Sequence, residues 1–216
     1  MLVGERMSSP VLSIEPEMPI QDALAQMRKD RVSRYPVLKK GKLVGIVAED
    51  DLLNASPSDV TSLSVWEVNY LLSKITVERV MMKDVITVTE DTPLEEAARI
   101  MADNRIGGMP VVRGDKVVGI ITQTDIFRIF LNLLGGRQAG WRVAVLVKNE
   151  PGILYKLTKA VNDAGGNIIA ITVFVDPKIQ GGEVTMKVDR IDGQALRDAL
   201  KPVVTEIRDF REVKVA

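Results

Sequence analysis

The side chains able to do chemistry in this chain are carboxylates, amines, guanidinium groups and hydroxyls, because the sequence contains no histidine and no cysteine. Zinc sites of the usual kind are therefore excluded, as are Ser–His and Cys–His nucleophile pairs. No acid–base pair stands at a diagnostic spacing, so the sequence does not predict an enzyme. The most informative spacing is Thr122-x-x-Asp125 directly before an apolar segment, a pattern that caps a helix.

The segment that holds Thr122 and Asp125 belongs to an internal sequence repeat. Residues 7–52 align without a gap with residues 81–126, and 13 of the 46 paired positions are identical. Such a repeat indicates one supersecondary unit that stacks on its twin to complete a core. We therefore expect two facing units with a cleft between them and two quasi-equivalent pockets in that cleft.

Each copy predicts the order β-α-β-β-α. The first strands are expected at 11–14 and 85–88. Apolar residues at helical spacing follow, namely Ile20, Ala23, Leu24 and Met27 in copy one and Leu94, Ala97, Ala98 and Met101 in copy two. Thr92 is expected to cap the second of these helices, with Pro93 in its first turn. A hairpin follows in each copy, at 109–112 and 116–121 in copy two, and a second helix ends each copy.

Two further helices are expected. Residues 59–79 form a connecting insert whose helix begins at the capping-box pattern Ser64-Val65-Trp66-Glu67. After copy two, the segment 126–134 is apolar over most of its circumference, so a helix there must be covered on several sides. It is either an internal core helix or a helix shared with a second subunit.

The C-terminal third follows a Gly-rich linker at 135–140 and has a different pattern. Strands are expected at 142–148, 168–175, 183–188 and 210–215, with helices from 153 to the Gly165-Gly166 stop and at 194–200. This β-α-β-β-α-β order is the ferredoxin-like arrangement. The predicted domains are thus repeat one (1–58), the insert (59–79), repeat two (80–134), the linker (135–140) and a ferredoxin-like domain (141–216), in an α+β fold.

Composition limits the classes of partner. The chain has 216 residues, 46% apolar and 27% charged, with a net charge of zero. A general nucleic-acid or anionic-membrane binder needs a basic excess, so neither partner is expected. No stretch is long and apolar enough to predict a membrane-spanning helix. Without cysteine there is no disulfide framework, and a cytoplasmic location is the default expectation.

Particular residues of the repeat resemble a known family. Arg34-Tyr35-Pro36-Val37 with 45–52, and Met109-Pro110-Val111-Val112 with 119–126, are similar to the motifs of a cystathionine-β-synthase (CBS) domain pair. The segments 149–154 and 166–168 resemble those of an ACT domain, a small amino-acid-sensing module. The two resemblances together cover almost the whole chain.

The CBS resemblance implies that the cleft binds an adenine nucleotide: AMP, ADP, ATP or S-adenosylmethionine, with Mg²⁺ as a potential companion. In that family a Ser/Thr and an Asp at the spacing of Thr122 and Asp125 contact ribose and phosphate. The alternative is that Asp125 only caps the next helix, and both roles are compatible. The implied nucleotide-binding residues are Thr122, Thr124, Asp125, Ile86, Ile106, Gly107, Gly108, Pro110, Asp51, Leu12, Val32, Ser33, Arg34 and Pro36. Tyr35 and Met109 are further apolar candidates, for which core packing is the competing explanation.

Copy one departs from the family pattern. Ala48 replaces Thr122, and the acidic run 49–51 would repel phosphate unless a cation intervenes. Arg34 can supply that cation, whereas its counterpart in copy two is Gly108. We expect unequal pockets, with the nucleoside in copy two and Arg34 reaching across to the phosphate. The competing interpretation makes Arg34 a solvated surface charge.

The ACT resemblance implies an amino-acid site at Asn149, Gly152, Ile153, Leu154, Asn167 and Ile168. Gly152 lets a ligand approach the backbone, and the following helix N-terminus attracts a carboxylate. Ordinary turn chemistry is the alternative for Asn149 and Gly152.

The expected function is therefore ligand-sensing regulation without catalysis, acting through an unidentified partner protein and in a homodimer. A purely structural dimerisation module with vestigial pockets is the main alternative. An RNA-binding module shares the β-α-β-β-α-β order, but the strands expected at 142–148 and 183–188 contain no aromatic residue on which bases stack.

Overall fold

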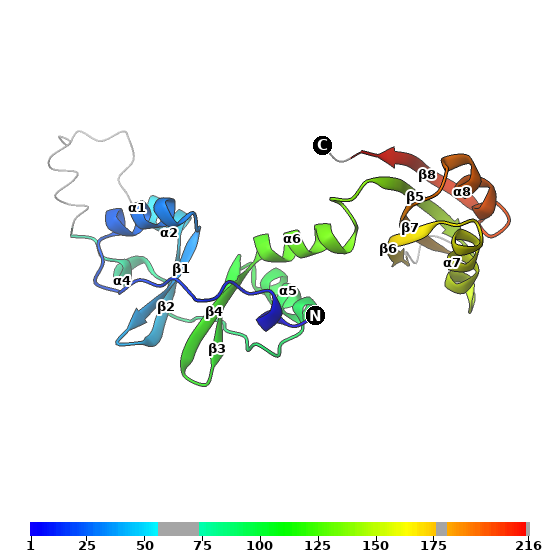
Figure 1. Ribbon diagram of the computed structural model, residues 1–216. Coiled ribbons are helices and arrows are strands. Elements are labelled where there is room, and N and C mark those ends of the chain that lie inside the picture. Colours follow the sequence, from blue (N-terminus) through cyan, green and yellow to red (C-terminus); the bar gives the residue numbers. More distant parts are fainter. Residues whose placement is uncertain (56–73, 176–180, 215–216) are drawn as a thin grey trace. The chain divides into compact units, whose positions relative to one another are not determined.

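The computed structural model describes residues 1–55, 74–175 and 181–214. The fold is α+β, as predicted, and it divides into two compact units, Met1–Ile126 (unit one) and Phe127–Ala216 (unit two) (Figure 1). The helix expected at 64–72, and with it most of the insert at 59–79, lies outside the described residues. In the part of the chain that is described, no helix is long and apolar enough to cross a membrane.

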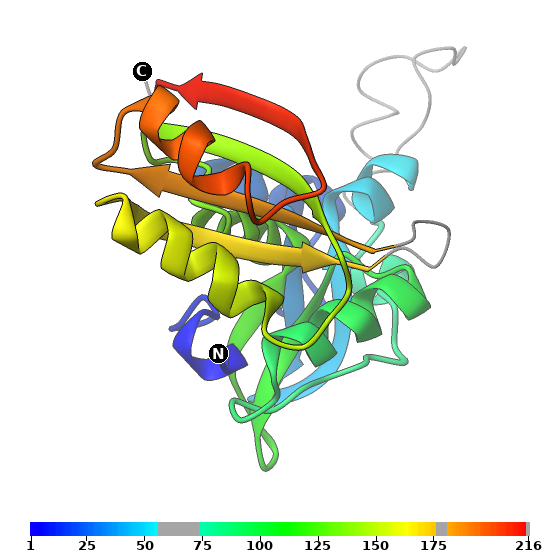
Figure 2. The ribbon, with the colours of Figure 1, turned by 90° about the vertical axis from the view of Figure 1, so that its right-hand side faces the viewer.

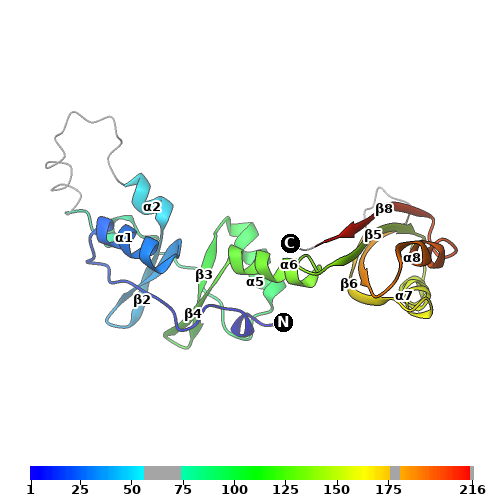
Figure 3. The same cartoon turned by 45° about the horizontal axis from the view of Figure 1, so that its top comes forward.

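Unit one contains two short hairpins with helices beside them. Its elements are η1 (Val3–Glu5), α1 (Ile20–Asp30), β1 (Arg34–Lys39), β2 (Lys42–Ala48), α2 (Glu49–Asn54), α4 (Val77–Val80), α5 (Leu94–Asn104), β3 (Gly108–Arg113), β4 (Lys116–Thr122) and the start of α6 (Gln123–Leu133). Figure 3 shows one hairpin with α1 and α2 and the other with α5.

The first long helix of each copy buries the predicted face. Ile20, Ala23 and Met27 of α1 are buried, as are Leu94, Ala97 and Met101 of α5. Both helices end at an arginine in the left-handed conformation, Arg31 with φ 56° and Arg105 with φ 54°. The two copies therefore share the backbone conformation at the end of this helix as well as its apolar pattern.

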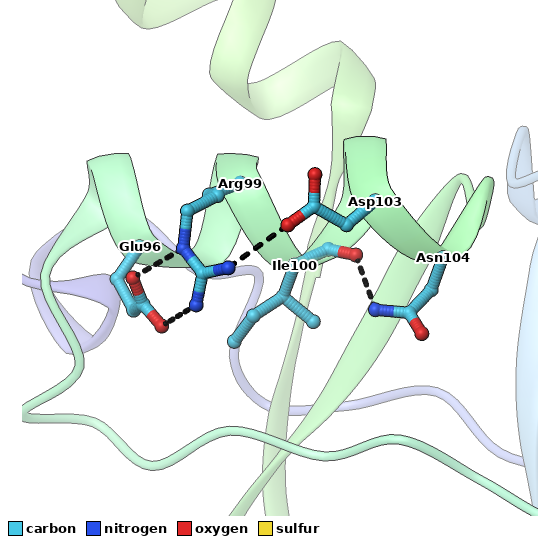
Figure 4. A network of polar contacts seen from close by, with 5 residues as sticks. All are labelled: Glu96, Arg99, Ile100, Asp103 and Asn104. Carbon is cyan, nitrogen blue, oxygen red and sulfur yellow. Dashed lines mark hydrogen bonds and ion pairs between the residues drawn. The ribbon is translucent and has the colours of Figure 1, made fainter.

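The outer face of α5 is polar (Figure 4). Nε of Arg99 donates to Oε2 of Glu96 at 2.9 Å, and its Nη1 donates to Oδ2 of Asp103 at 2.8 Å. Nδ2 of Asn104 donates to the carbonyl of Ile100 at 2.8 Å. These groups are exposed, so their contribution to stability is small. They mark the solvent side of a helix whose other side faces the hairpin.

Two local predictions were wrong. The strands expected at 11–14 and 85–88 reduce to single parallel bridges, Ile14 with Val37 and Val88 with Val111. In copy one Ile14 donates to Pro36 and accepts from Leu38, so just one residue of the segment joins the strand. Thr92 does not cap α5 either: Pro93 is the N-cap, and the Thr92 hydroxyl accepts a hydrogen bond from the Thr89 amide.

The two copies are joined by a reciprocal exchange of backbone. The segment that opens copy one pairs with the hairpin of copy two through Ser8 and Ile120. The segment that opens copy two pairs with the hairpin of copy one through Met82 and Ile46. Both exchanges cross a glycine: a Cβ on Gly119 would lie 2.4 Å from Sδ of Met7, and one on Gly45 would lie 2.5 Å from Sδ of Met81. The glycines shared by both copies thus admit the chain from the other copy.

Helix α6 is exposed within the chain. The helix predicted at 126–134 is present, but it contributes no buried residue. Phe127 is 67% exposed and Leu133 is 55% exposed. The interpretation of α6 as an internal core helix is therefore wrong, and the shared-helix interpretation stays a prediction.

Unit two has the predicted ferredoxin-like order. After the end of α6 it contains β5 (Gly140–Val147), α7 (Ile153–Asp163), β6 (Asn167–Phe174), β7 (Gly182–Asp189), α8 (Gly193–Leu200) and β8 (Glu206–Val213). The sheet is antiparallel in the order β6-β7-β5-β8. Helices α7 and α8 lie on one face of it, as Figure 2 shows. The last strand begins at Glu206, earlier than expected.

The core of unit two lies between the helices and one face of the sheet. Alternate residues of β5 and β7 are buried there, together with Leu157 of α7 and Leu196 of α8. Gly165 has φ 84°, consistent with the predicted glycine stop after α7.

The exchange predicts a specific coupling in stability. Gly119→Ala should lower the melting temperature of unit one and cost about 1 kcal/mol or more, because the added methyl overlaps Met7. In a Met7→Ala background the same substitution should cost less than half as much. Differential scanning calorimetry, with unit two as the internal reference, measures both values.

The control for this double-mutant cycle combines Gly119→Ala with a methionine that contacts the other glycine. Gly119→Ala combined with Met81→Ala should be additive, since Met81 packs on Gly45. Additivity of Gly119→Ala with Met7→Ala as well would contradict the proposed contact.

Candidate functional site

Two predicted site segments meet within each copy. The amide of Glu49 donates to the carbonyl of Ser33 at 2.9 Å, and in copy two the amide of Gln123 donates to the carbonyl of Gly107 at 3.0 Å. The strand registers pair Arg34 with Ala48 and Gly108 with Thr122. The turn before each hairpin thus lies beside the start of the following helix.

Arg34 crosses from copy one to copy two. A Cβ built on Gly107 would lie 2.3 Å from Nη2 of Arg34, and one on Gly108 would lie 3.0 Å from its Cδ. The guanidinium group occupies the space that side chains would fill at these two glycines. Gly107 and Gly108 of copy two therefore leave room for a cation that comes from copy one.

The environment of Arg34 is unusual for a cation. Its Nε is buried and has no hydrogen-bond partner within the described ranges. Burial lowers the pKa of Arg34, while the negative charges of Asp51 and Asp50 oppose that effect. A buried guanidinium donor without an acceptor is costly. An anion placed here would satisfy it.

Thr122 and Asp125 form a cap at the start of α6. Oδ2 of Asp125 accepts from the Thr122 amide at 3.0 Å and from the Thr122 hydroxyl at 2.6 Å. The capping role is therefore present, and it leaves the ligand role open. In copy one the backbone bond is kept, from the Ala48 amide to Oδ2 of Asp51 at 2.8 Å, but the hydroxyl is missing.

The carboxylates of residues 49–51 in copy one do not converge on a common site. Within the described residues, no three carboxylates come together in a group that could hold a metal ion. Glu49, Asp50 and Asp51 are consecutive residues of α2, so their side chains leave the helix in different directions.

The apolar candidates separate into exposed and buried groups. Leu12 is 49% exposed and Ile86 is 36% exposed, whereas Val32 and Ile106 are half-buried. Tyr35 and Met109 are buried in the core, and Tyr35 donates to Oδ2 of Asp30 at 2.7 Å. Core packing therefore accounts for Tyr35 and Met109.

The two predicted prolines are buried in their hairpins. Pro36 and Pro110 are buried within the hairpins, and their carbonyls accept from the amides of Ile14 and Val88. Their role as ligand contacts stays a prediction. Thr124, in contrast, is exposed in the first turn of α6.

A cavity of about 390 Å³ opens beside α1. Val32 and Ser33, both predicted, line it with Glu49. Arg28 and Arg31 also line it and were missed from the sequence. The signal available for Arg31 is its identity with Arg105 in the repeat, together with its place at the end of a helix.

Unit two has its own cavity at the start of α7, of about 270 Å³. Four of the predicted amino-acid-site residues line it: Asn149, Gly152, Ile153 and Leu154. Gly152 adopts φ 83°, the left-handed conformation that favours glycine. Glu150 also lines the cavity and accepts a hydrogen bond from Nζ of Lys156 at 2.7 Å.

Asn167 and Ile168 lie elsewhere. Asn167 is at the other end of β6, where its Nδ2 donates to Oδ1 of Asp189 at 2.8 Å. Ile168 packs against the core of unit two. The structure does not bring these two residues together with Gly152, because β6 begins at the end of α7 farthest from Gly152. A role for them in amino-acid binding stays a prediction.

Comparison with known proteins identifies the family. Residues 3–58 and 77–132 match the CBS domain, and residues 141–204 match the ACT domain. The CBS match alone covers more than half of the chain. The chain therefore belongs to the CBS-domain family, as a CBS pair followed by an ACT domain.

Two solved structures resemble the CBS part of the chain. The CBS domain pair of protein MJ0100, solved with 5′-methylthioadenosine and S-adenosyl-L-methionine, is 31% identical with a TM-score of 0.51, over 64% of this chain and 98% of that one. AcuB from Vibrio cholerae, a protein assigned to acetoin utilisation, is 31% identical with a TM-score of 0.52, over 62% of this chain and 93% of that one.

Relatives in Methanocaldococcus jannaschii share only part of their length with this chain. Protein MJ1225 is 29% identical over 137 residues, which are 60% of this chain and 47% of the relative. L-aspartate semialdehyde sulfurtransferase is 32% identical over 131 residues, 60% of this chain and 23% of that enzyme. The chain thus spans about half or less of these relatives.

Proposed function

We propose that this protein is a non-catalytic regulator that binds an adenine nucleotide between its two CBS repeats. The observation that carries the proposal is Arg34, a half-buried cation from copy one that lies on Gly107 and Gly108 of copy two with its buried Nε unsatisfied among the described residues. Phosphate is the natural acceptor for such a guanidinium group. The complex of the MJ0100 CBS pair with two adenosine derivatives supports this choice of ligand class.

The two pockets are unequal in this proposal. Copy two supplies Thr122, Asp125 and the exposed Ile86 to the nucleoside, since a carboxylate accepts from both ribose hydroxyls. Copy one supplies the cation for the phosphate. Its own helix start lacks the hydroxyl at Ala48 and carries acidic residues that compete for Arg34. Mg²⁺ then enters, if at all, with the nucleotide.

Substitution of the two equivalent aspartates should have opposite results. Asp125→Ala should weaken AMP binding by about tenfold or more, because it removes a charged hydrogen-bond acceptor. Asp51→Ala should leave the affinity unchanged or raise it, because it removes a negative charge near Arg34. Arg34→Met should weaken AMP binding by about tenfold while leaving adenosine, which lacks phosphate, unaffected. Isothermal titration calorimetry with and without Mg²⁺ measures each affinity.

Arg113→Met provides a matched control, since Arg113 is exposed and pairs with Glu90. Because Asp125 also caps α6, its loss should lower stability by about 1 kcal/mol, and thermal unfolding must show that the variant is folded. Equal loss of AMP binding in the two aspartate variants would refute the asymmetry. If the wild-type protein binds none of AMP, ADP, ATP and S-adenosylmethionine in the calorimeter, the nucleotide proposal is wrong and the structural dimerisation module is favoured.

A second ligand, an amino acid, is proposed for the cavity at the start of α7. Asn149 at its edge offers an amide to polar groups, and the open backbone at Gly152 precedes the helix N-terminus. Apolar side chains including Ile153 and Leu154 complete a lining suited to an aliphatic amino acid.

Asn149→Ala should abolish the thermal stabilisation that the best amino acid of a twenty-member panel gives. The reason is that the amide is the uncharged polar side chain at this cavity, and loss of such a bond weakens binding by about tenfold. Asn167→Ala is the matched control and should retain the stabilisation, because it lies outside the cavity. The reverse pattern would place the site at the other end of β6.

A homodimer is proposed from the exposed apolar surface of α6. Phe127 and Leu133 of this helix are both more than half exposed. Large exposed apolar side chains of this kind mark an interface. A second copy is the occupant that symmetry favours.

The double variant Phe127→Lys with Leu133→Lys should convert the dimer to a monomer, because charges at a buried interface are costly to desolvate. Size-exclusion chromatography with light scattering gives the mass. Leu12→Lys, a comparable exposed apolar position in unit one, should leave the dimer intact. A wild-type protein that is monomeric at all concentrations would contradict the proposal.

A further inference from the structure

The sheet of unit two has a second face, opposite to α7 and α8. A cavity of about 540 Å³ lies on it, lined by strand residues and by the end of α6 with the linker that follows. Its walls include Phe130, Leu134 and Phe174. This cavity is separate from the one at Asn149 and Gly152, and neither the CBS nor the ACT match assigns a ligand to it.

Lys187 lies at the floor of this cavity. It is only 5% exposed although it is a lysine in the middle of β7. Its neighbours Met186 and Val188 point into the helix-covered core, so strand alternation places Lys187 on the opposite face. The register sets it beside Arg142 of β5 and Ala170 of β6, and all three line the cavity.

The linker covers the lysine stem. A Cβ on Gly135 would lie 3.0 Å from Cγ2 of Ile169 and 3.2 Å from Cγ of Lys187, and Gly135 adopts φ 61°. The backbone of the linker thus passes directly over Lys187, which explains its burial. The apolar stem is packed, and the amine at its end borders the cavity.

The charges at this floor do not balance. Within the described part of the chain, no carboxylate or carbonyl accepts a hydrogen bond from the Lys187 amine. Asp209 is the nearby carboxylate on this face, and it is already shared by Arg142 and Arg211. Burial lowers the pKa of Lys187, and the positive charge of Arg142 lowers it further. Among the described residues, the positive charge of Lys187 therefore has no carboxylate partner at this site.

We propose that this cavity binds an aliphatic monocarboxylate, with its carboxylate on Lys187 and Arg142 and its hydrocarbon tail against Phe130, Leu134 and Phe174. A phosphorylated or otherwise highly polar ligand would leave its polar groups against apolar walls. A neutral apolar ligand would leave the lysine unpaired. The volume lies within the range of small-molecule pockets.

Octanoate and 1-octanol are the probes that test this assignment, since they share a tail and differ in charge. Octanoate should bind the full-length protein, as measured by isothermal titration calorimetry. Lys187→Met should weaken octanoate by about tenfold or more and leave octanol unchanged, because methionine keeps the apolar stem and removes the charge. Ala170→Leu should weaken both probes, because the larger side chain fills the cavity.

Lys159→Met on the outer side of α7 is the matched control and should bind both probes as the wild type does. Melting temperature and AMP binding should be unchanged in Lys187→Met, so that a failure here is distinct from a failure of the nucleotide proposal. Absence of octanoate binding, or equal loss of both probes in Lys187→Met, would overturn the assignment. A change of oligomeric mass in Ala170→Leu without octanoate binding would show that a second copy covers this face.

Discussion

The site in unit one depends on the reciprocal exchange of backbone between the two repeats. Ser8 pairs with Ile120 and Met82 pairs with Ile46, so each hairpin is completed by the segment that opens the other copy. A hairpin alone is marginally stable in water. The exchange gives each hairpin an additional strand contact and fixes the two copies against one another. That fixed relation is what carries Arg34 onto Gly107 and Gly108.

The same exchange allows a symmetric repeat to build an asymmetric site. Both copies keep the aspartate that caps their second helix, but copy two alone keeps the threonine hydroxyl, and copy one alone supplies an arginine. In a pair of identical pockets, two arginines would meet at one cleft and repel one another. In copy two the equivalent position is Gly108, so that repulsion is absent, and Gly107 and Gly108 together provide the space. The proposed anionic ligand would satisfy the buried Nε of Arg34.

The sequence predicted the elements whose signals are local or periodic. The repeat, the buried faces of α1 and α5 and the order of unit two follow from spacing alone. The strands at 11–14 and 85–88 were wrong because one bridging residue in each, Ile14 or Val88, has the same apolar signature as a strand. Lys187 was missed for a related reason. A lysine between Met186 and Val188 looks like an ordinary outward position, and its burial is caused by the linker at Gly135, which is distant in sequence.

Helix α6 is the element through which the proposed ligands could influence one another. It begins at the cap formed by Thr122 and Asp125, and its last turn lines the cavity above Lys187. A nucleotide that binds Asp125 competes with the cap for the carboxylate, and a carboxylate ligand packs on Phe130 and Leu134. Either ligand shifts α6 only to the extent that it binds two states of the helix with different affinity. By linkage, any such effect must be equal in both directions.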